Sequence, residues 1–291
     1  MTQPVLGFIG LGVMGEPICR NIMTGSGGPM IVSDLATAPI QRLVSQGAVE
    51  ARPEALAEQA DIIFLSLPGG PEVETVVSML LPTLREGQIL VDMSTAPVAL
   101  TRDLAARVAA RGCAYADAPV ARTRAAAEAG TLAIMVGADD ATYDTLLPLL
   151  SHAGEDVLHC GPVGCGQIAK ILNNMVLFQN VVALSEALAL GRAAGMEGER
   201  LFQVLSQGSA DSFALRNHGM KAMLPDTYPE QAFPTGYALK DVGYALELAR
   251  DSGLSAPGAE LARARMDLAR EAGFEREYFP VLARLAGRDS V

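Results

Sequence analysis

The sequence contains few metal-binding side chains and little positive charge. It has three histidines and four cysteines in 291 residues, and neither a CxxC pair nor a His/Cys ligand spacing, so no metal site is expected. The formal net charge is -11, and no block of Lys and Arg interleaves with aromatic residues. Nucleic acid and anionic membrane surfaces are therefore not expected as partners, and an anionic ligand needs a local cationic site.

The sequence also lacks an uninterrupted apolar run of the length that spans a membrane, about 20 residues. Its longest apolar run is interrupted by Asn174, Gln179, Asn180 and Glu186. No signal peptide precedes the first expected strand. We therefore expect a cytoplasmic protein with reduced thiols, in which Cys160 and Cys165 are small buried hydrophobic residues.

Lysine is the scarce base, since only Lys170, Lys221 and Lys240 accompany the arginines among 22 basic residues. Arginine cannot give up its proton, so a retained lysine marks a position where a titratable amine is needed. At 291 residues the chain is long enough for about two domains.

Lys170 lies in a stretch typical of a loop that leads into a long helix. Three glycines and a proline precede it within residues 161–166, and helix-forming apolar residues follow it. Asn173 and Asn174 follow at helical spacing, so the three polar side chains share one face. A buried amine without a partner tends to lose its proton, which suits proton transfer. The alternative is a structural lysine in the first turn that reaches water.

The chain begins with the pattern of a dinucleotide-binding turn. An apolar run over residues 5–9 precedes the sequence GLGVMG, and a helical stretch follows. Strand, GxGxxG and helix in this order let a pyrophosphate approach a helix N-terminus closely; the alternative is a glycine-rich turn without a ligand. We expect the cofactor to contact Gly10, Leu11, Gly12, Val13, Met14 and Gly15.

A second strand, over residues 30–33, ends at Asp34. This is about the ~20 residues past the glycines at which an acid meets the ribose hydroxyls. Asp34 would repel a 2′-phosphate, and the residues after it offer no arginine to bind one. NAD is therefore favoured over NADP as the cofactor.

The alternation of strand and helix then continues. We expect strands near Val49 and over residues 61–66, 89–92, 114–117, 130–137 and 156–160, and helices over 39–46, 97–112 and 140–150. Cofactors lie across the carboxyl ends of parallel strands, which places Leu67, Pro68, Ser94 and Thr95 near the dinucleotide. Ser94 and Thr95 are also candidates for capping the helix near residue 97, and the two roles are compatible.

Arg122 and Arg124 lie just beyond the strand over residues 114–117. A guanidinium in this place can hold an anion through two parallel hydrogen bonds. The alternative, for Arg124 above all, is a solvated loop charge.

Together these motifs resemble the β-hydroxyacid dehydrogenase family, which includes 3-hydroxyisobutyrate dehydrogenases and tartronate semialdehyde reductases. The resemblance covers essentially the whole chain and rests on the turn over residues 10–15, Asp92-Met-Ser-Thr95, Asp117-Ala-Pro-Val120, Gly130-Thr-Leu132, Gly164-Cys-Gly166, Lys170, Asn173-Asn174 and Lys240-Asp241. It implies an α/β Rossmann-type domain with a mainly parallel sheet (1–163), a long interdomain helix (164–194) and a second, all-α domain (195–291).

The resemblance also implies roles for individual residues. Lys170 is the implied catalytic residue, supported by Asn174, and Thr95 and Lys240 are implied to contact the cofactor. Ser94, Thr123 and Asn173 are expected to contact the substrate. The family's decarboxylating relative, 6-phosphogluconate dehydrogenase, carries a glutamate seven residues after its lysine, where this chain has Leu177. A redox reaction without decarboxylation is therefore expected.

The substrate loop departs from the family pattern. The usual Ser-Gly-Gly becomes Ala121-Arg122-Thr123, so a long cationic side chain replaces a glycine. A similar Gly-Arg-Thr loop occurs in the sulfolactaldehyde reductase branch. We expect Arg122 to hold the acid group of the substrate.

The chain after Gly195 is expected to be all helical, with helices over residues 199–207, 239–251, 258–271 and 279–285. Such a domain usually buries apolar faces against another subunit, so a homodimer or homotetramer is expected. Lys240 is expected to open a helix, and Phe213, Phe233 and Tyr237 are expected to be core residues although they could line a cleft.

The sequence therefore predicts an NAD-dependent oxidoreductase that interconverts a small β-hydroxy acid and its semialdehyde, with Lys170 as general acid and base. Sulfolactaldehyde and succinic semialdehyde are alternative substrates for the same site. A catalytically silent dinucleotide-binding module is the alternative from another class, and the presence of Lys170 argues against it. Imine reduction is a third possibility and would need a different proton donor.

Overall fold

The computed structural model describes residues 3–230 and 232–287. The chain divides after Lys170 into two compact units. We call them the sheet unit and the helical unit, and each is described by itself.

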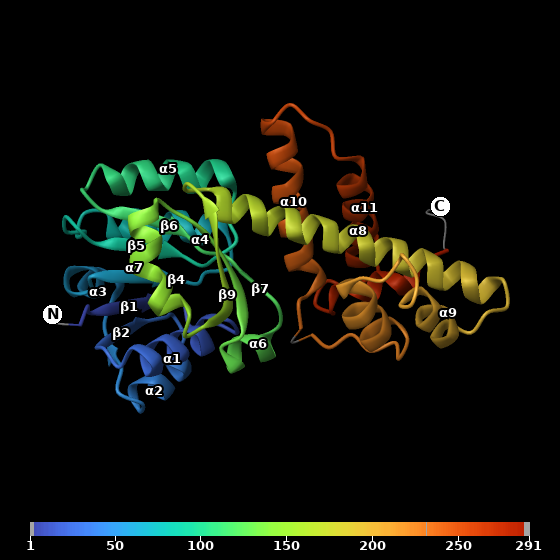
Figure 1. Ribbon diagram of the computed structural model, residues 1–291, viewed down its shortest axis with the longest axis horizontal. Helices are drawn as coiled ribbons and strands as arrows, with labels where there is room; N and C mark the ends of the chain where they lie inside the picture. Colours follow the sequence, from blue (N-terminus) through green and yellow to red (C-terminus); the bar gives the residue numbers. More distant parts are fainter. Residues whose placement is uncertain (1–2, 231, 288–291) are drawn as a thin grey trace. The chain divides into compact units, whose positions relative to one another are not determined.

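The sheet unit is built on a nine-stranded, mainly parallel sheet (Figure 1). Its strands are β1 (Leu6–Ile9), β2 (Met30–Ser33), β3 (Val49–Glu50), β4 (Ile62–Leu65), β5 (Ile89–Asp92), β6 (Ala114–Asp117), β7 (Val120–Ala121), β8 (Leu132–Gly137) and β9 (Gly154–Gly161). Their order is β3-β2-β1-β4-β5-β6-β8-β7, with β9 beside β8. The strands from β1 to β6 are parallel, whereas β8 runs antiparallel to β6 and β7. The order reverses between β1 and β4, which is the switch point where such sheets bind ligands.

Two layers of helices bury the two faces of this sheet. One layer contains α1 (Gly15–Ser26), α2 (Thr37–Val44), α6 (Arg124–Ala129) and α7 (Asp140–Leu150), and the other contains α3 (Pro53–Gln59), α4 (Gly70–Leu80) and α5 (Val98–Ala109). Alternate residues of one strand serve the two cores, so Phe8 packs in one and Ile9 in the other. A strand buried on both faces must be apolar throughout, as β1 is.

Most of the expected elements of the sheet unit are present. The strands over residues 30–33, 89–92 and 114–117 and the helix over 140–150 have the expected bounds. Four elements were not predicted: the helix α4, with 11 residues, and the shorter α3, α6 and β7. Beyond these differences the Rossmann-type fold followed by a helical part is confirmed, while the treatment of residues 164–194 as a separate interdomain segment stays a prediction.

The helical unit contains most of α8 (Cys165–Ala193), then α9 (Gly198–Leu205), the π-helix η1 (Leu215–Met223), α10 (Thr235–Asp251), α11 (Pro257–Glu271) and the 3-10 helix η2 (Phe279–Leu285). Phe178, Phe202 and Phe279 are fully buried in its core. The π-helix was not predicted. Helix α10 begins four residues earlier than expected, so Lys240 lies in its second turn and does not open it.

Two of the three aromatic residues expected in the core are on the surface. Phe213 is 56% exposed and Tyr237 45% exposed, so the prediction is wrong for both. Phe233 is half-buried and packs its ring against Phe178 and Phe279, with centroids 6.2 and 5.8 Å apart.

Two further expectations need correction. Among the described helices, α8 is the one long and apolar enough to cross a membrane by length and composition, with a mean hydropathy of 1.3, a test that core helices also pass. The polar interruptions in its sequence therefore do not exclude it as expected. Cys160 and Cys165 are half-buried free thiols and not core residues, whereas Cys19 and Cys113 are buried.

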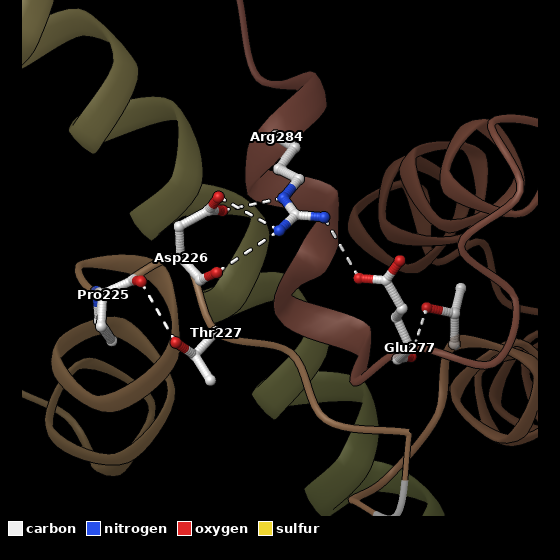
Figure 2. Close-up of polar contacts among 6 residues, drawn as sticks. Pro225, Asp226, Thr227, Glu277 and Arg284 are labelled. Carbon is white, nitrogen blue, oxygen red and sulfur yellow. Dashed lines mark hydrogen bonds and ion pairs between the residues drawn. The ribbon is translucent and has the colours of Figure 1, made fainter.

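A group of charged residues around Arg284 joins η2 to other parts of the helical unit (Figure 2). Arg284, in η2, donates to both carboxylate oxygens of Asp226 at 2.9 and 3.2 Å and to Glu277 at 3.3 Å. Its guanidinium also lies 4.9 Å from the ring centroid of Tyr228. We call this group the Arg284 clamp. Asp226 has a φ of 52°, a conformation that Asp tolerates better than most residues.

Candidate functional site

The glycine turn after β1 leaves no room for side chains at two positions. Gly10 has a φ of 94°, and a Cβ there would lie 2.3 Å from the carbonyl oxygen of Ser66. A Cβ on Gly15 would lie 2.0 Å from the carbonyl oxygen of Gly10. A Cβ added to Gly12 would have no atom within 4 Å, so a ligand can approach the backbone closely there. This combination of tight and open positions fits a pyrophosphate.

The same turn forms the N-terminus of α1. The amide of Glu16 donates to the carbonyl of Gly12 at 3.1 Å, so helical bonding begins only there. Amides at such a helix end have no partner within the helix and favour an anion. Leu11 is buried beneath the turn, Val13 is 56% exposed and Met14 is half-buried.

Asp34, at the end of β2, is bonded to the glycine turn itself. Its Oδ2 accepts a hydrogen bond from the amide of Leu11, and its Oδ1 accepts one from the amide of Ala36 at 2.7 Å. Each carboxylate oxygen has a second lone pair, so both could still accept a ribose hydroxyl. Asp34 thus holds the turn in place and faces it with negative charge.

The ends of β4 and β5 are joined by Ser94. Its Oγ accepts a hydrogen bond from the amide of Leu67 at 2.9 Å, and its own amide donates to Oδ1 of Asp92 at 2.9 Å. Helix α5 has Pro97 at its N-cap and no side-chain cap, so capping by Ser94 or Thr95 is wrong. Ser94 is 4% exposed, whereas Thr95 is half-buried and Pro68 exposed.

The first turn of α8 is fixed to the carboxyl edge of the sheet by two buried side chains. Asp117, the last residue of β6, accepts hydrogen bonds from the amides of Gly164 and Gln167, both at 2.7 Å. The Gln167 side chain donates to the carbonyl of Ser94 at 2.8 Å and accepts from the amide of Ala96 at 3.1 Å. Helix α8 therefore starts against the loops that follow β5 and β6.

Lys170 lies one turn of α8 beyond Gln167 and is half-buried. Side chains three residues apart share a helix face, so Lys170 follows the side chain that bonds to Ser94 and Ala96. The lysine is thereby held at the edge of the sheet that carries the glycine turn. Both features lie within the sheet unit.

Asp92 and Asp117 are buried acids on neighbouring strands and are paired in register. Burial raises the pKa of each carboxyl to about 6, although hydrogen bonds from Ser94 and from the start of α8 act in the opposite direction. The Tyr115 hydroxyl donates to Asp92 at 3.3 Å. The acids act on the site through the backbone that they hold.

A second polar cluster lies in the helical unit and contains Asn174 and Lys240. The Asn174 amide donates to Oδ2 of Asp241 at 2.7 Å, and Asn173 donates to Oδ1 of Asn174 at 3.1 Å. The Lys240 amine lies 3.0 Å from Oδ1 of Asp241 and 5.1 Å from the ring centroid of Tyr244. Asn174 and Asp241 are buried, whereas Asn173 is exposed.

Arg122 is engaged differently from what the sequence predicted. Its guanidinium donates to the carbonyl of Thr131 at 2.6 Å, to Glu155 at 3.1 Å and to Asp156. It would have to give up two carboxylates to hold an anion, so the expected grip on a substrate acid group is not supported. Thr123, next to it, caps α6 by accepting from the amide of Ala126 at 3.4 Å. The alternative for Arg124 holds, since it pairs with Glu128 on the exposed face of α6.

Sequence reasoning missed Asp117, Gln167 and Asp241 as site-forming residues. Asp117 and Asp241 were noted only as letters of family motifs. A sharper signal was present, since an acid that ends an otherwise apolar strand, as Asp92 and Asp117 do, must find donors for its carboxylate. Gln167 carries no such signal, because its partners are backbone groups remote in sequence.

Comparison with known proteins agrees with this geometry. Residues 5–161 match the family described as the NAD binding domain of 6-phosphogluconate dehydrogenase. Residues 164–285 match the family described as NAD-binding of NADP-dependent 3-hydroxyisobutyrate dehydrogenase.

Among curated proteins, the chain is 36% identical to the 2-(hydroxymethyl)glutarate dehydrogenase of Eubacterium barkeri, over 94% of this chain and 91% of that protein. It is 33% identical to the NAD-dependent L-serine dehydrogenase of Pseudomonas aeruginosa, over 96% and 97%. The solved 3-hydroxyisobutyrate dehydrogenase of Mycobacterium tuberculosis with L-serine has a TM-score of 0.89 at 30% identity, covering 98% of this chain and 99% of that one.

The fold and the glycine turn thus define an NAD-binding oxidoreductase of the Rossmann type that acts on hydroxy groups. More specifically, the chain belongs to the β-hydroxyacid dehydrogenase family.

Proposed function

We propose that the protein uses NAD to interconvert a small β-hydroxy acid and its semialdehyde, with Lys170 as general acid and base. The observation that carries the proposal is the anchoring of the first turn of α8 by Asp117 and Gln167. This anchoring fixes Lys170 at the sheet edge that bears the glycine turn and Asp34. An amine and a dinucleotide cradle at one edge are the two parts that hydride and proton transfer need.

The residues of the cradle fit NAD. Gly10, Gly12 and Gly15 shape the turn for the pyrophosphate, and Asp34 faces the turn where a ribose would lie. Leu11, Val13 and Met14 complete the turn, and Leu67, Pro68, Thr95 and Lys240 remain the proposed contacts with the rest of the cofactor. The bound cofactor supplies the hydride acceptor or donor.

The chain's own residues handle the proton and the substrate. In the oxidative direction the Lys170 amine would take the proton of the substrate hydroxyl while hydride passes from the carbon that bears this hydroxyl to the bound cofactor. In reduction the amine would return the proton to the carbonyl oxygen. Ser94, Thr123, Asn173 and Asn174 are the proposed substrate-side groups. Asn174 is held by Asp241, so its amide has a fixed orientation.

The decisive experiment compares Lys170→Ala with Lys221→Ala. Lys221 is an exposed lysine on η1 that bonds to Asn217, which makes it a matched control for loss of an amine. We expect Lys170→Ala to lower kcat by about 10²- to 10⁴-fold, the usual contribution of a general acid or base. NADH binding, followed by fluorescence, should survive in both variants. Equal loss of NADH binding and turnover in Lys170→Ala would point to a structural lysine.

The substrate is identified by NADH absorbance with a panel of acids. The panel contains 3-hydroxyisobutyrate, 2-(hydroxymethyl)glutarate, L-serine, tartronate semialdehyde, succinic semialdehyde and sulfolactaldehyde. Turnover of none of them, together with tight NADH binding, would favour a silent dinucleotide-binding module. An amine product would instead favour imine reduction.

The same assay tests the cofactor preference. The Asp34 carboxylate should repel a 2′-phosphate, so kcat/KM should be higher with NAD than with NADP. Asp34→Ser should narrow that difference, because the charge is removed. A preference for NADP in the unmodified protein would contradict the assignment of Asp34.

A further inference from the structure

Arg122 has a backbone conformation that its side chain disfavours. Its φ is 87°, and it is one of two non-glycine residues with positive φ among those that the structure describes. A Cβ makes this region costly, and only glycine enters it freely. Arg122 therefore holds a backbone conformation that glycine would adopt without this cost.

The Arg122 side chain has three partners, one just before β8 and two on β9. It reaches the carbonyl of Thr131, just before β8, and the carboxylates of Glu155 and Asp156 on β9. The Arg122 side chain is 35% exposed and those of Glu155 and Asp156 are 67% and 48% exposed, so these contacts lie at the surface and depend on their number and geometry. Several charge-assisted bonds from one guanidinium fix both its position and its direction.

An irregularity in the sheet delivers both carboxylates. The register of β8 and β9 shifts between Leu132, opposite Gly154, and Ala133, opposite Asp156. Glu155 is therefore the extra residue of a β-bulge, and bulges re-aim the side chains around them. Ala133 in turn pairs with Ala121, the residue before Arg122. The bulge thus lies two strands away from β7, beside the row of paired residues Asp156, Ala133 and Ala121, and Ala121 is the residue before Arg122.

We infer that Arg122 is a positioning residue, which holds the substrate loop over residues 121–123 in its left-handed conformation by tethering it to the bulge on β9. This inference rests on the proposed function, because only that function makes residues 121–123 a loop that contacts the substrate. The guanidinium does not bind the substrate, because two carboxylates already satisfy its charge. The tether replaces the freedom of glycine, so the loop keeps the shape that receives the acid group of the substrate.

The test compares Arg122→Gly with Arg122→Ala. Glycine adopts positive φ without a tether, whereas alanine keeps the conformational cost and loses the tether. We expect Arg122→Ala to raise KM for the acid substrate about tenfold, and Arg122→Gly to stay within about twofold of the unmodified protein. The value of kcat should change little in either variant. Arg124→Ala, which removes a neighbouring exposed arginine, is the matched control.

Other results would overturn the inference. Equal increases in KM for the glycine and alanine variants would show that the guanidinium itself binds the anion. An unchanged KM in both would show that the loop does not depend on residue 122. The double variant Glu155→Gln, Asp156→Asn separates the roles further: a tether predicts a raised KM, whereas an anion ligand freed from its carboxylates predicts a lowered one.

A readout without substrate keeps this test apart from the proposed function. Hydrogen exchange of the amides over residues 120–126 should be faster in Arg122→Ala than in Arg122→Gly or Arg124→Ala, because the untethered loop leaves its conformation. If no acid in the panel is turned over, the proposed function fails while the exchange experiment still decides on the tether. Equal exchange in all variants would overturn the tether even in an active enzyme.

Discussion

Among the residues that the structure describes, the sheet unit and the helical unit each have one non-glycine residue at positive φ, and an arginine stabilises the two in different ways. In the helical unit the residue is Asp226, at φ 52°, and Arg284 comes to it from 58 residues further along the chain. In the sheet unit the residue is Arg122, at φ 87°, and the arginine itself reaches out to the carboxylates. An Asp is tolerated in this region, whereas an Arg is not favoured there.

The surroundings of the two arginines explain what each contributes. Arg284 lies over the rings of Tyr228 and Phe274, 4.9 and 5.7 Å from their centroids, and so joins η2 to the packed part of the helical unit. Arg122 joins a loop to a bulge at the edge of a sheet. The same pair of chemical groups therefore joins η2 to a packed core in one unit and a loop to a strand at the sheet edge in the other.

The buried titratable groups extend this contrast. The sheet unit buries Asp92 and Asp117, and burial raises their pKa values to about 6. The helical unit buries His218, and burial together with the nearby Lys221 charge lowers its pKa to about 4. Both kinds of group prefer the neutral form, but acid acts on them in opposite directions.

The largest effect is expected in the sheet unit, from Asp117→Ala. The change removes the acceptor of two buried amides, and each unsatisfied amide costs about 1 to 3 kcal/mol. We expect the free energy of unfolding to fall by about 3 kcal/mol, measured by urea denaturation at pH 4, where the buried Asp117 carboxyl is neutral. Asp103→Ala, at an exposed position on α5, is the control and should change stability by less than about 0.5 kcal/mol. Equal losses in the two variants would contradict the role of Asp117 at the start of α8.

The second prediction concerns acid and His218. Its folded pKa, about 4, lies below the ordinary histidine value of 6.5, so the unfolded chain binds more protons between these values. Stability contributed by neutral His218 is therefore present above pH 6.5 and is lost as the pH falls toward 4, by up to about 3 kcal/mol. In thermal unfolding, the difference in stability between His218→Gln and the unmodified chain should become smaller as the pH falls. A difference independent of pH would contradict it.

Asp92 and Asp117 should respond with the opposite sign. Their folded pKa values, about 6, lie above the ordinary aspartate value of 3.8, so the folded chain binds more protons between these values. Their contribution to stability is present below pH 3.8 and is lost as the pH rises through 6. The free energy of unfolding of Asp92→Asn should therefore rise relative to that of the unmodified chain as the pH increases from 4 to 6. For His218→Gln the relative stability should rise as the pH decreases.

The third prediction tests the two arginines against each other. Arg284→Ala removes the ion pairs with Asp226 and Glu277 and the contacts with two rings, and we expect it to lower the free energy of unfolding by about 2 kcal/mol. KM for the acid substrate should not change. Arg122→Ala should show the reverse pattern, with a raised KM and little loss of stability. If both variants were less stable and neither had a raised KM, the two arginines would not differ in their roles.

The sequence predicted the parts of the fold that local patterns determine. Strand β1 and the glycine turn follow from an apolar run and three glycines, and α7 follows from a helical pattern that begins after Asp139, its N-cap. The helix that carries Lys170 was also predictable from its glycine-rich start. These features depend on neighbouring residues, which a sequence displays directly.

The features that escaped prediction depend on contacts between distant residues. Gln167 bonds to Ser94 and Ala96, more than 70 residues away, and no local pattern announces it. Arg122 looked like an anion ligand because its two carboxylate partners are more than 30 residues further along. The bulge that brings them together is a property of strand register, which a single sequence does not reveal.

The smallest effect is expected at Asp226, where glycine and alanine variants separate conformation from charge. Both variants lose the carboxylate bonds to Arg284 and keep the backbone carbonyl that accepts from it, but only alanine keeps the cost of positive φ. Asp226→Gly should therefore be more stable than Asp226→Ala by about 1 kcal/mol in thermal unfolding. The same ordering at residue 122 should appear in KM and hardly in stability, because we propose that the loop over residues 121–123 shapes the substrate site, whereas Asp226 belongs to the Arg284 clamp. Equal stability of the two Asp226 variants would mean that the Arg284 clamp acts through charge alone.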